Sequence, residues 1–174
     1  MKSLIIYPGT FNPLHKGHLA IAHWAIEYYT PKNAKSQIPV YFDVALGSYD
    51  KDPYISDYEF NQRCQAIYDL GYPTYNTNEK TFLKKEWLIR RSEDSWFIKT
   101  YIYFLVGIDT AERIDSPKYY CDSEQERDYS LDAYNQKYTR FVVFPRAVKE
   151  YNAENFSPAF RKLAIKAEGF EPVE

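Results

Sequence analysis

The stretch YPGTFNPLHKGHLAIA, Tyr7–Ala22, decides the fold of this chain. It continues a short apolar run, Lys2–Tyr7, which predicts a buried strand that ends at Pro8-Gly9. Apolar residues then recur at helical spacing over residues 15–29, and Pro31 stops the pattern. The stretch is therefore predicted to be the loop that joins a buried strand to a helix.

The rest of the chain repeats this alternation. Apolar runs predict strands at Val40–Leu46, Tyr101–Val106 and Thr139–Phe144 (the last strand), with Pro73–Asn76 as a short candidate. Helical patterns cover Ser56–Leu70, Thr81–Arg91, Thr110–Ile114 and, as the closing helix, Ser157–Ala167, while Asp122–Lys137 is predicted to be a surface helix or a long loop. Alternation of this kind predicts an α/β fold, a Rossmann-like open parallel sheet with helices on both faces.

Composition narrows the classes of partner. The 174 residues contain no linker, so we expect one domain over residues 1–174. A net charge of −2 gives no general attraction to nucleic acid or to a membrane, so phosphate recognition must be local. Cys64 and Cys121 show no CxxC spacing, no apolar run reaches membrane-spanning length, and the apolar start is too short for a signal peptide. We expect a cytoplasmic protein, with homo-oligomerisation left open.

All three histidines, His15, His18 and His23, follow this first loop. The first strand-to-helix loop of an open parallel sheet favours phosphate, because Gly9 permits close backbone approach and the helix start carries unpaired N–H groups. His15 and His18 share one helix face and can aim at one anion, and Gly17 removes a side chain that would collide with it. His23 lies about half a turn away and receives no site role.

Two plainer interpretations of the histidine pair stand beside this one. A histidine pair at a helix start is often structural or a cap. A metal site would need a third ligand at suitable spacing, and none lies nearby in the sequence.

The whole string GTFNPLHKGH, residues 9–18, resembles the GxFxPxHxGH signature of the nucleotidylyltransferase superfamily. Its Asn-Pro form is similar to that of the nicotinate and nicotinamide mononucleotide adenylyltransferase branch. HxGH alone also resembles class I aminoacyl-tRNA synthetases, for which this chain is too short. Leu105–Tyr120 (LVGIDTAERIDSPKYY) is similar to a second family block, and weaker similarities are Tyr49–Tyr54, Arg63 and Asn78 with Thr81-Phe82.

The resemblance implies transfer of AMP from ATP to a phosphate-bearing small-molecule acceptor, with release of pyrophosphate. It implies that His18 hydrogen-bonds the transferring phosphate beside His15 and Lys16. The nucleotide and its phosphates would be bound by Gly9, Thr10, Phe11, Asn12, Gly17, Gly107, Asp109, Arg146 and Arg161. Mg²⁺ would arrive with the triphosphate, held by its oxygens and by water, with no metal ligand from protein side chains.

One family signature, Ile-Ser-Ser-Thr-x-x-Arg, is missing from the sequence. Either NFSPAFR, Asn155–Arg161, is a degenerate version with Ser157 and Arg161 in matching places, or Gly169-Phe170-Glu171 aligns with the segment before the signature and the chain stops short of it. In the second case Arg146 or Lys149 must help to bind the triphosphate, or turnover is weak.

Three other functions stay open. They are a nucleotide-binding protein with weak or lost transfer, a cytidylyltransferase acting on a small phosphorylated metabolite, and RNA binding through Lys84-Lys85, Trp87, Arg90-Arg91 and Trp96. For the last group of residues, an amphipathic helix with a solvated basic face is the favoured interpretation.

Overall fold

A five-stranded, all-parallel sheet forms the centre of the protein, as the computed structural model shows for residues 2–47, 55–92 and 100–173. The strand order is β2-β1-β3-β4-β5. The strands are β1 (Lys2–Gly9), β2 (Val40–Val44), β3 (Thr100–Gly107), β4 (Thr139–Phe144) and β5 (Ala164–Lys166). The predicted Rossmann-like α/β fold is confirmed.

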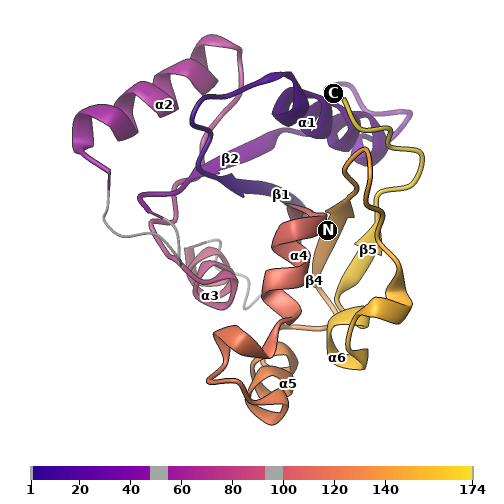
Figure 1. Ribbon diagram of the computed structural model, residues 1–174. Helices are drawn as coiled ribbons and strands as arrows, with labels where there is room; N and C mark the ends of the chain where they lie inside the picture. The colour runs from indigo at the N-terminus through magenta and orange to yellow at the C-terminus, as the bar shows by residue number, and fades with distance from the viewer. Residues whose placement is uncertain (1, 48–54, 93–99, 174) are drawn as a thin grey trace.

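Helices cover both faces of this sheet (Figure 1). On one face, α1 (Lys16–Tyr29) and α2 (Asp57–Asp69) pack against Ile5 and Tyr7 of β1. The opposite face carries α3 (Phe82–Ser92), α4 (Ile108–Asp115), the 3₁₀ turn η1 (Pro117–Tyr119), α5 (Glu124–Asp132), the 3₁₀ turn η2 (Ala153–Asn155) and α6 (Pro158–Arg161). Alternate residues of β1 therefore point into two separate apolar cores.

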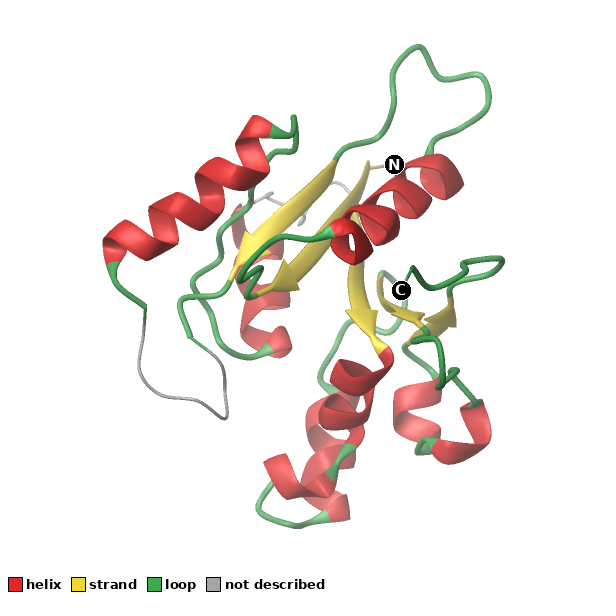
Figure 2. Cartoon of the chain, turned by 45° about the horizontal axis from the view of Figure 1, so that its top comes forward, coloured by secondary structure: helices red, strands yellow, loops and turns green. Residues whose placement is uncertain are grey.

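Strand order places the switch of chain direction between β1 and β3. The chain leaves β1 toward β2 on one side and returns to β3 on the other side. Ligands of open α/β sheets bind outside the carboxyl ends of the strands at such a point. The loop after Gly9 and the N-terminus of α4, which begins at Ile108 directly after β3, flank this crevice. The turned view of Figure 2 shows a strand that passes straight into a helix at this end of the sheet.

Two predicted elements are wrong. Pro73–Asn76 makes only an isolated bridge, between Phe42 and Thr74, because the side chain of Asn76, and not its backbone, accepts the next N–H of β2, that of Val44. The closing helix predicted over Ser157–Ala167 ends at Arg161, and the chain continues as β5, so β4 is not the last strand. The run Leu163–Ala167 is apolar enough for a short strand beside β4, and pairing with β4 overrides its helical pattern.

Other segments match the predictions more closely. The segment with two alternatives, Asp122–Lys137, contains α5, whose Leu131 is fully buried. The motif Tyr49–Tyr54 and the residue Trp96 lie outside the described residues.

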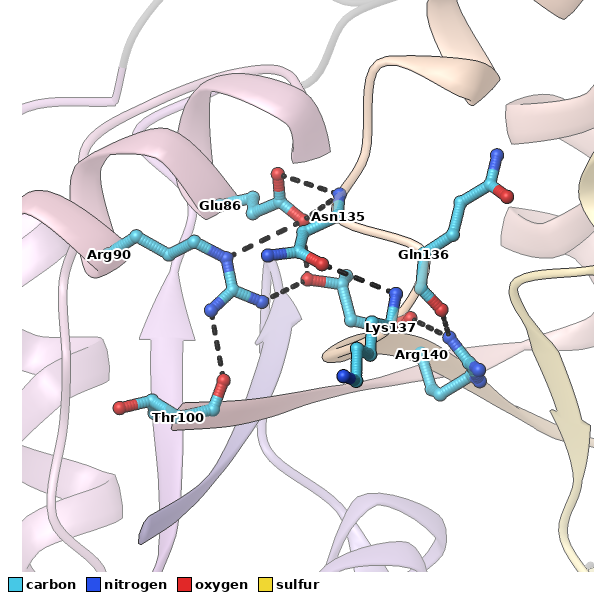
Figure 3. Close-up of polar contacts among 8 residues, drawn as sticks. Glu86, Arg90, Thr100, Asn135, Gln136, Lys137 and Arg140 are labelled. Carbon is cyan, nitrogen blue, oxygen red and sulfur yellow. Dashed lines mark hydrogen bonds and ion pairs between the residues drawn. The ribbon is translucent and has the colours of Figure 1, made fainter. Parts of the chain in front are cut away.

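A polar network fixes α3 to the amino ends of two strands (Figure 3). The Arg90 guanidinium donates to the Thr100 carbonyl at 2.9 Å and to the Thr139 hydroxyl at 2.6 Å. The Glu86 carboxylate accepts from that same hydroxyl and from the Asn135 N–H, the latter at 3.1 Å. Since Glu86 is buried, these partners satisfy a carboxylate that water cannot reach.

Candidate active site

The loop after β1 folds around the ring of Phe11. Phe11 is 2% exposed, and its φ of 48° turns the chain so that the ring packs edge-on against Tyr7 and His18. A Cβ on Gly9 would lie 2.9 Å from that ring. Glycine is therefore required because of Phe11, which differs from the predicted reason of close approach to a ligand.

His15 and His18 form the cap of α1. His15 is the N-cap residue, its Nδ1 accepting the Gly17 N–H at 3.1 Å. In return the His15 N–H donates to Nδ1 of His18 at 3.2 Å. The two imidazole rings stack with centroids 3.6 Å apart, so the structure brings together the pair that the sequence predicted. The capping interpretation is confirmed, and the functional one stays a prediction.

These hydrogen bonds decide where the ring protons lie. Burial, and to a smaller extent the neighbouring His15, lower the pKa of His18 to about 4, so its imidazole is neutral at pH 7. Because Nδ1 of His18 accepts a hydrogen bond, its proton lies on Nε2, and the same reasoning places a proton on Nε2 of His15. The stacked pair thus presents two neighbouring N–H donors, and His18 acts as a donor without a net charge.

Gly17 is needed for this stack. A Cβ there would lie 3.0 Å from Cε1 of His15, so the glycine makes room for an imidazole, where the sequence predicted room for a ligand. Asn12 and Lys16 are exposed beside the pair. Nε2 of His23 lies 3.2 Å from the Glu27 carboxylate, one turn along α1, on an exposed part of the helix.

A second group of predicted residues lies after β3 and β4. Gly107 is the N-cap of α4, and the space where a Cβ would stand is open. Asp109, in the first turn of α4, pairs with Arg146 at 3.0 Å and with Lys149 at 3.7 Å. Lys149 also contacts Glu112. Asp109 and Arg146, predicted separately as nucleotide ligands, are therefore partners of each other.

A cleft of about 340 Å³ opens at the carboxyl ends of β1 and β2. Its walls include Gly9 and Thr10 of the first loop, Thr81 and Phe82 at the start of α3, and Arg113 of α4. Tyr119, Tyr120 and Tyr134 also line it. His15, His18, Asp109 and Arg146 do not line it, so the cleft adjoins the histidine loop through Thr10.

The start of α6 is already occupied by a carboxylate. Asp115, at the end of α4, accepts the Ser157 N–H at 2.8 Å and the Ser157 hydroxyl hydrogen at 2.5 Å. Arg127 lies 3.9 Å from the same carboxylate. The groups of NFSPAFR that would grip a phosphate are satisfied internally, and Arg161 lies exposed on α6, outside the cleft. These contacts of Ser157 and the position of Arg161 give no support to NFSPAFR as a phosphate-binding version of the missing signature.

Two charged residues near the loop and the cleft were not predicted as site residues. Arg63 of α2, one-tenth exposed, donates to the Thr10 carbonyl at 3.2 Å. Lys85, placed by sequence in a basic face, is buried beside Asp43. The sequence did contain a signal for this pair, because Asp43 stands inside the apolar run VYFDVAL and a buried carboxylate requires a partner.

Comparison with known proteins decides the family. The profile of the cytidylyltransferase-like family matches residues 6–154. This range includes the loop after β1, the loop after β4 and the residues that line the cleft. The chain belongs to the cytidylyltransferase-like family. A search of curated proteins found no match.

Two solved structures share the fold of this cytidylyltransferase-like protein. Both are of Plasmodium falciparum nicotinic acid mononucleotide adenylyltransferase, one complexed with NaAD and one with APC. Each is 12% identical and covers 95% of this chain and 75% of that chain, with TM-scores of 0.58 and 0.53. At this identity the likeness concerns the fold, and the family supports a nucleotidyltransferase.

Within residues 2–47, 55–92 and 100–173, no helix has the length and apolar character needed to cross a membrane. The same residues contain no group of three or more histidine, cysteine or carboxylate side chains able to hold a metal.

Proposed function

We propose that this protein transfers AMP from ATP to the phosphate of nicotinamide or nicotinate mononucleotide and releases pyrophosphate. The observation that carries the proposal is the stacked histidine pair at the start of α1, which offers two neighbouring Nε2–H donors to phosphate oxygens. Family membership and the fold support the nucleotidyltransferase class.

In the proposed reaction an acceptor phosphate oxygen attacks the α-phosphorus of ATP. One P–O bond forms, the bond between the α-phosphorus and the bridging oxygen breaks, and pyrophosphate leaves without a covalent enzyme intermediate. His18 donates its Nε2–H to an oxygen of the transferring phosphate, where negative charge builds up in the transition state. The N-terminus of α1 and Lys16 add positive potential, and the main contribution is positioning.

Each reactant has a place in this proposal. The triphosphate lies over the loop and α1, with Mg²⁺ bound to its own oxygens and to water. Arg146 and Lys149 take over the role of the missing signature, because both carry their charge at the carboxyl end of the sheet. The acceptor lies in the cleft, which begins at Thr10 and holds aromatic rings for a pyridine base.

A screen read by pyrophosphate release tests the proposal. ATP and CTP are each offered with nicotinamide mononucleotide, nicotinate mononucleotide, choline phosphate and glycerol phosphate. We expect release with ATP and a pyridine mononucleotide. Release with CTP and a polyol or choline phosphate instead would assign the protein to the cytidylyltransferase alternative.

A second candidate is a nucleotide-binding protein with weak or lost transfer. The internal satisfaction of Ser157 by Asp115 favours it, because NFSPAFR then offers no grip for the β- and γ-phosphates. Binding of ATP by calorimetry without pyrophosphate release from any acceptor, under conditions where a control adenylyltransferase turns over, would support this candidate.

A further inference from the structure

A buried ion pair lies beside the cleft: its lysine lines both the cleft and a small neighbouring cavity, and its carboxylate lines the small cavity. Asp43, the fourth residue of β2, is 0% exposed, and Lys85 of α3 is 5% exposed. Lys85 Nζ donates to Asp43 Oδ2 at 2.7 Å and to the Thr77 hydroxyl at 3.1 Å. Thr77 in turn donates its N–H to the other carboxylate oxygen at 3.1 Å. The three side chains thus form one closed hydrogen-bonded unit.

This unit leaves one donor of Lys85 for a ligand. An ammonium group carries three hydrogens, and within residues 2–47, 55–92 and 100–173 Nζ makes the two hydrogen bonds just described. Lys85 lines both the cleft and the small cavity that adjoins Asp43. An oxygen that enters the cleft can therefore reach a lysine whose direction is already set by two partners.

The rest of α3 holds Lys85 in this direction. Glu86, the next residue, points to Asn135 and Thr139 at the start of β4, and Arg90 is fixed to Thr100 (Figure 3). Neighbouring helix residues point about 100° apart. The Glu86–Arg90 network and the Asp43–Lys85 pair therefore anchor α3 at two sides and prevent it from rotating.

We infer that Lys85 is a specificity-determining residue that hydrogen-bonds an uncharged oxygen of the acceptor substrate in the cleft. This rests on the proposed function. Asp43 already neutralises the ammonium at 2.7 Å, so Lys85 itself offers little net charge to a carboxylate of the acceptor; Lys80 and Arg113 are the other cations that line the cleft. A carbonyl or hydroxyl oxygen completes the coordination of Nζ without added charge. The carboxamide of nicotinamide mononucleotide and the ribose hydroxyls are the two sources of such an oxygen.

The test uses Asp43→Asn/Lys85→Met, which removes both charges and keeps an acceptor for the Thr77 N–H. Calorimetry measures binding of nicotinamide mononucleotide, nicotinate mononucleotide and ATP to the wild type and to the variant. Lys84→Met is the matched control, because Lys84 is the exposed neighbour on the same helix. Urea midpoints check the fold of each protein.

We expect the Kd for nicotinamide mononucleotide to rise at least tenfold in the double variant, about the effect of one lost charge-assisted hydrogen bond. The Kd for ATP and all constants of Lys84→Met stay within twofold. A carboxamide contact also predicts that the wild type prefers the amide to the acid and that the variant loses this preference. A hydroxyl contact predicts equal losses for both mononucleotides.

Unchanged binding of nicotinamide mononucleotide in a folded variant would overturn the inference, as would loss of the acid alone. If the variant does not fold, the ¹⁵N signal of the Lys85 ammonium in the wild type must shift on addition of nicotinamide mononucleotide, and an unshifted signal overturns it. Because binding and not turnover is measured, absent pyrophosphate release rejects the proposed transfer separately. A wild type that binds neither mononucleotide rejects the inference.

Discussion

The carboxylate of Asp109 lies 3.0 Å from Nε of Arg146 and so joins the first turn of α4 to the loop after β4. Both side chains are about half exposed. An exposed pair of this kind contributes only about 0–1 kcal/mol to stability, so it opens at little cost when a stronger anion arrives. Under the proposed function a triphosphate is such an anion, and we expect Arg146 to bind its β- and γ-phosphates.

Replacement of Arg146 tests this role. Arg146→Met is expected to raise the KM for ATP about tenfold, with kcat for pyrophosphate release changed less, because a ground-state phosphate contact is lost. Arg161→Met is the matched comparison and should leave the KM within twofold. A larger effect at Arg161 than at Arg146 would restore NFSPAFR as the phosphate grip.

The Nε2–H of His18 is the group most tightly tied to the proposed chemistry. His18→Asn retains a side-chain acceptor for the His15 N–H but moves the donor, so we expect kcat to fall by about two to three orders of magnitude. His23→Asn, on the exposed side of α1, is the control and should retain activity. Near-normal pyrophosphate release from a folded His18→Asn protein would contradict the assignment.

The lowered pKa of His18 predicts a dependence of stability on pH. The folded value is about 4, whereas an unfolded histidine titrates near 6.5. Between these values the unfolded chain binds more protons at this residue, so stability falls as the pH drops through this window and levels off below it. Urea unfolding at several pH values should show a shallower fall for His18→Asn than for the wild type, and identical slopes would argue against a buried neutral imidazole.

Asp115 is predicted to stabilise the fold without acting on substrate. Asp115→Ala leaves the Ser157 N–H and Arg127 without their buried partner, which should lower the free energy of unfolding by about 2–4 kcal/mol. Asp115→Asn retains a carbonyl acceptor and should lose less. Denaturant titration measures both, and a KM for ATP that changes in the folded fraction would instead place this carboxylate near the nucleotide.

Local patterns in the sequence were enough to predict much of the local structure around the candidate site. The apolar periodicity of residues 2–29, together with Pro8 and Pro31, was enough to predict the strand, the loop and the helix of this stretch. The pairing of His15 with His18 follows from helical spacing. Spacing along one element reports which side chains share a face, because the backbone geometry of that element is regular.

The partners across the fold could not be obtained in this way. Asp43 with Lys85 and Asp115 with Ser157 are each separated by 42 residues. Such partners are chosen by which elements the sheet order brings side by side, and each buried carboxylate then selects a donor within reach. Ala164–Lys166 became a strand for a similar reason. In a longer α6 its backbone groups would have bonded within the helix, whereas the free edge of β4 offered them partners across the sheet.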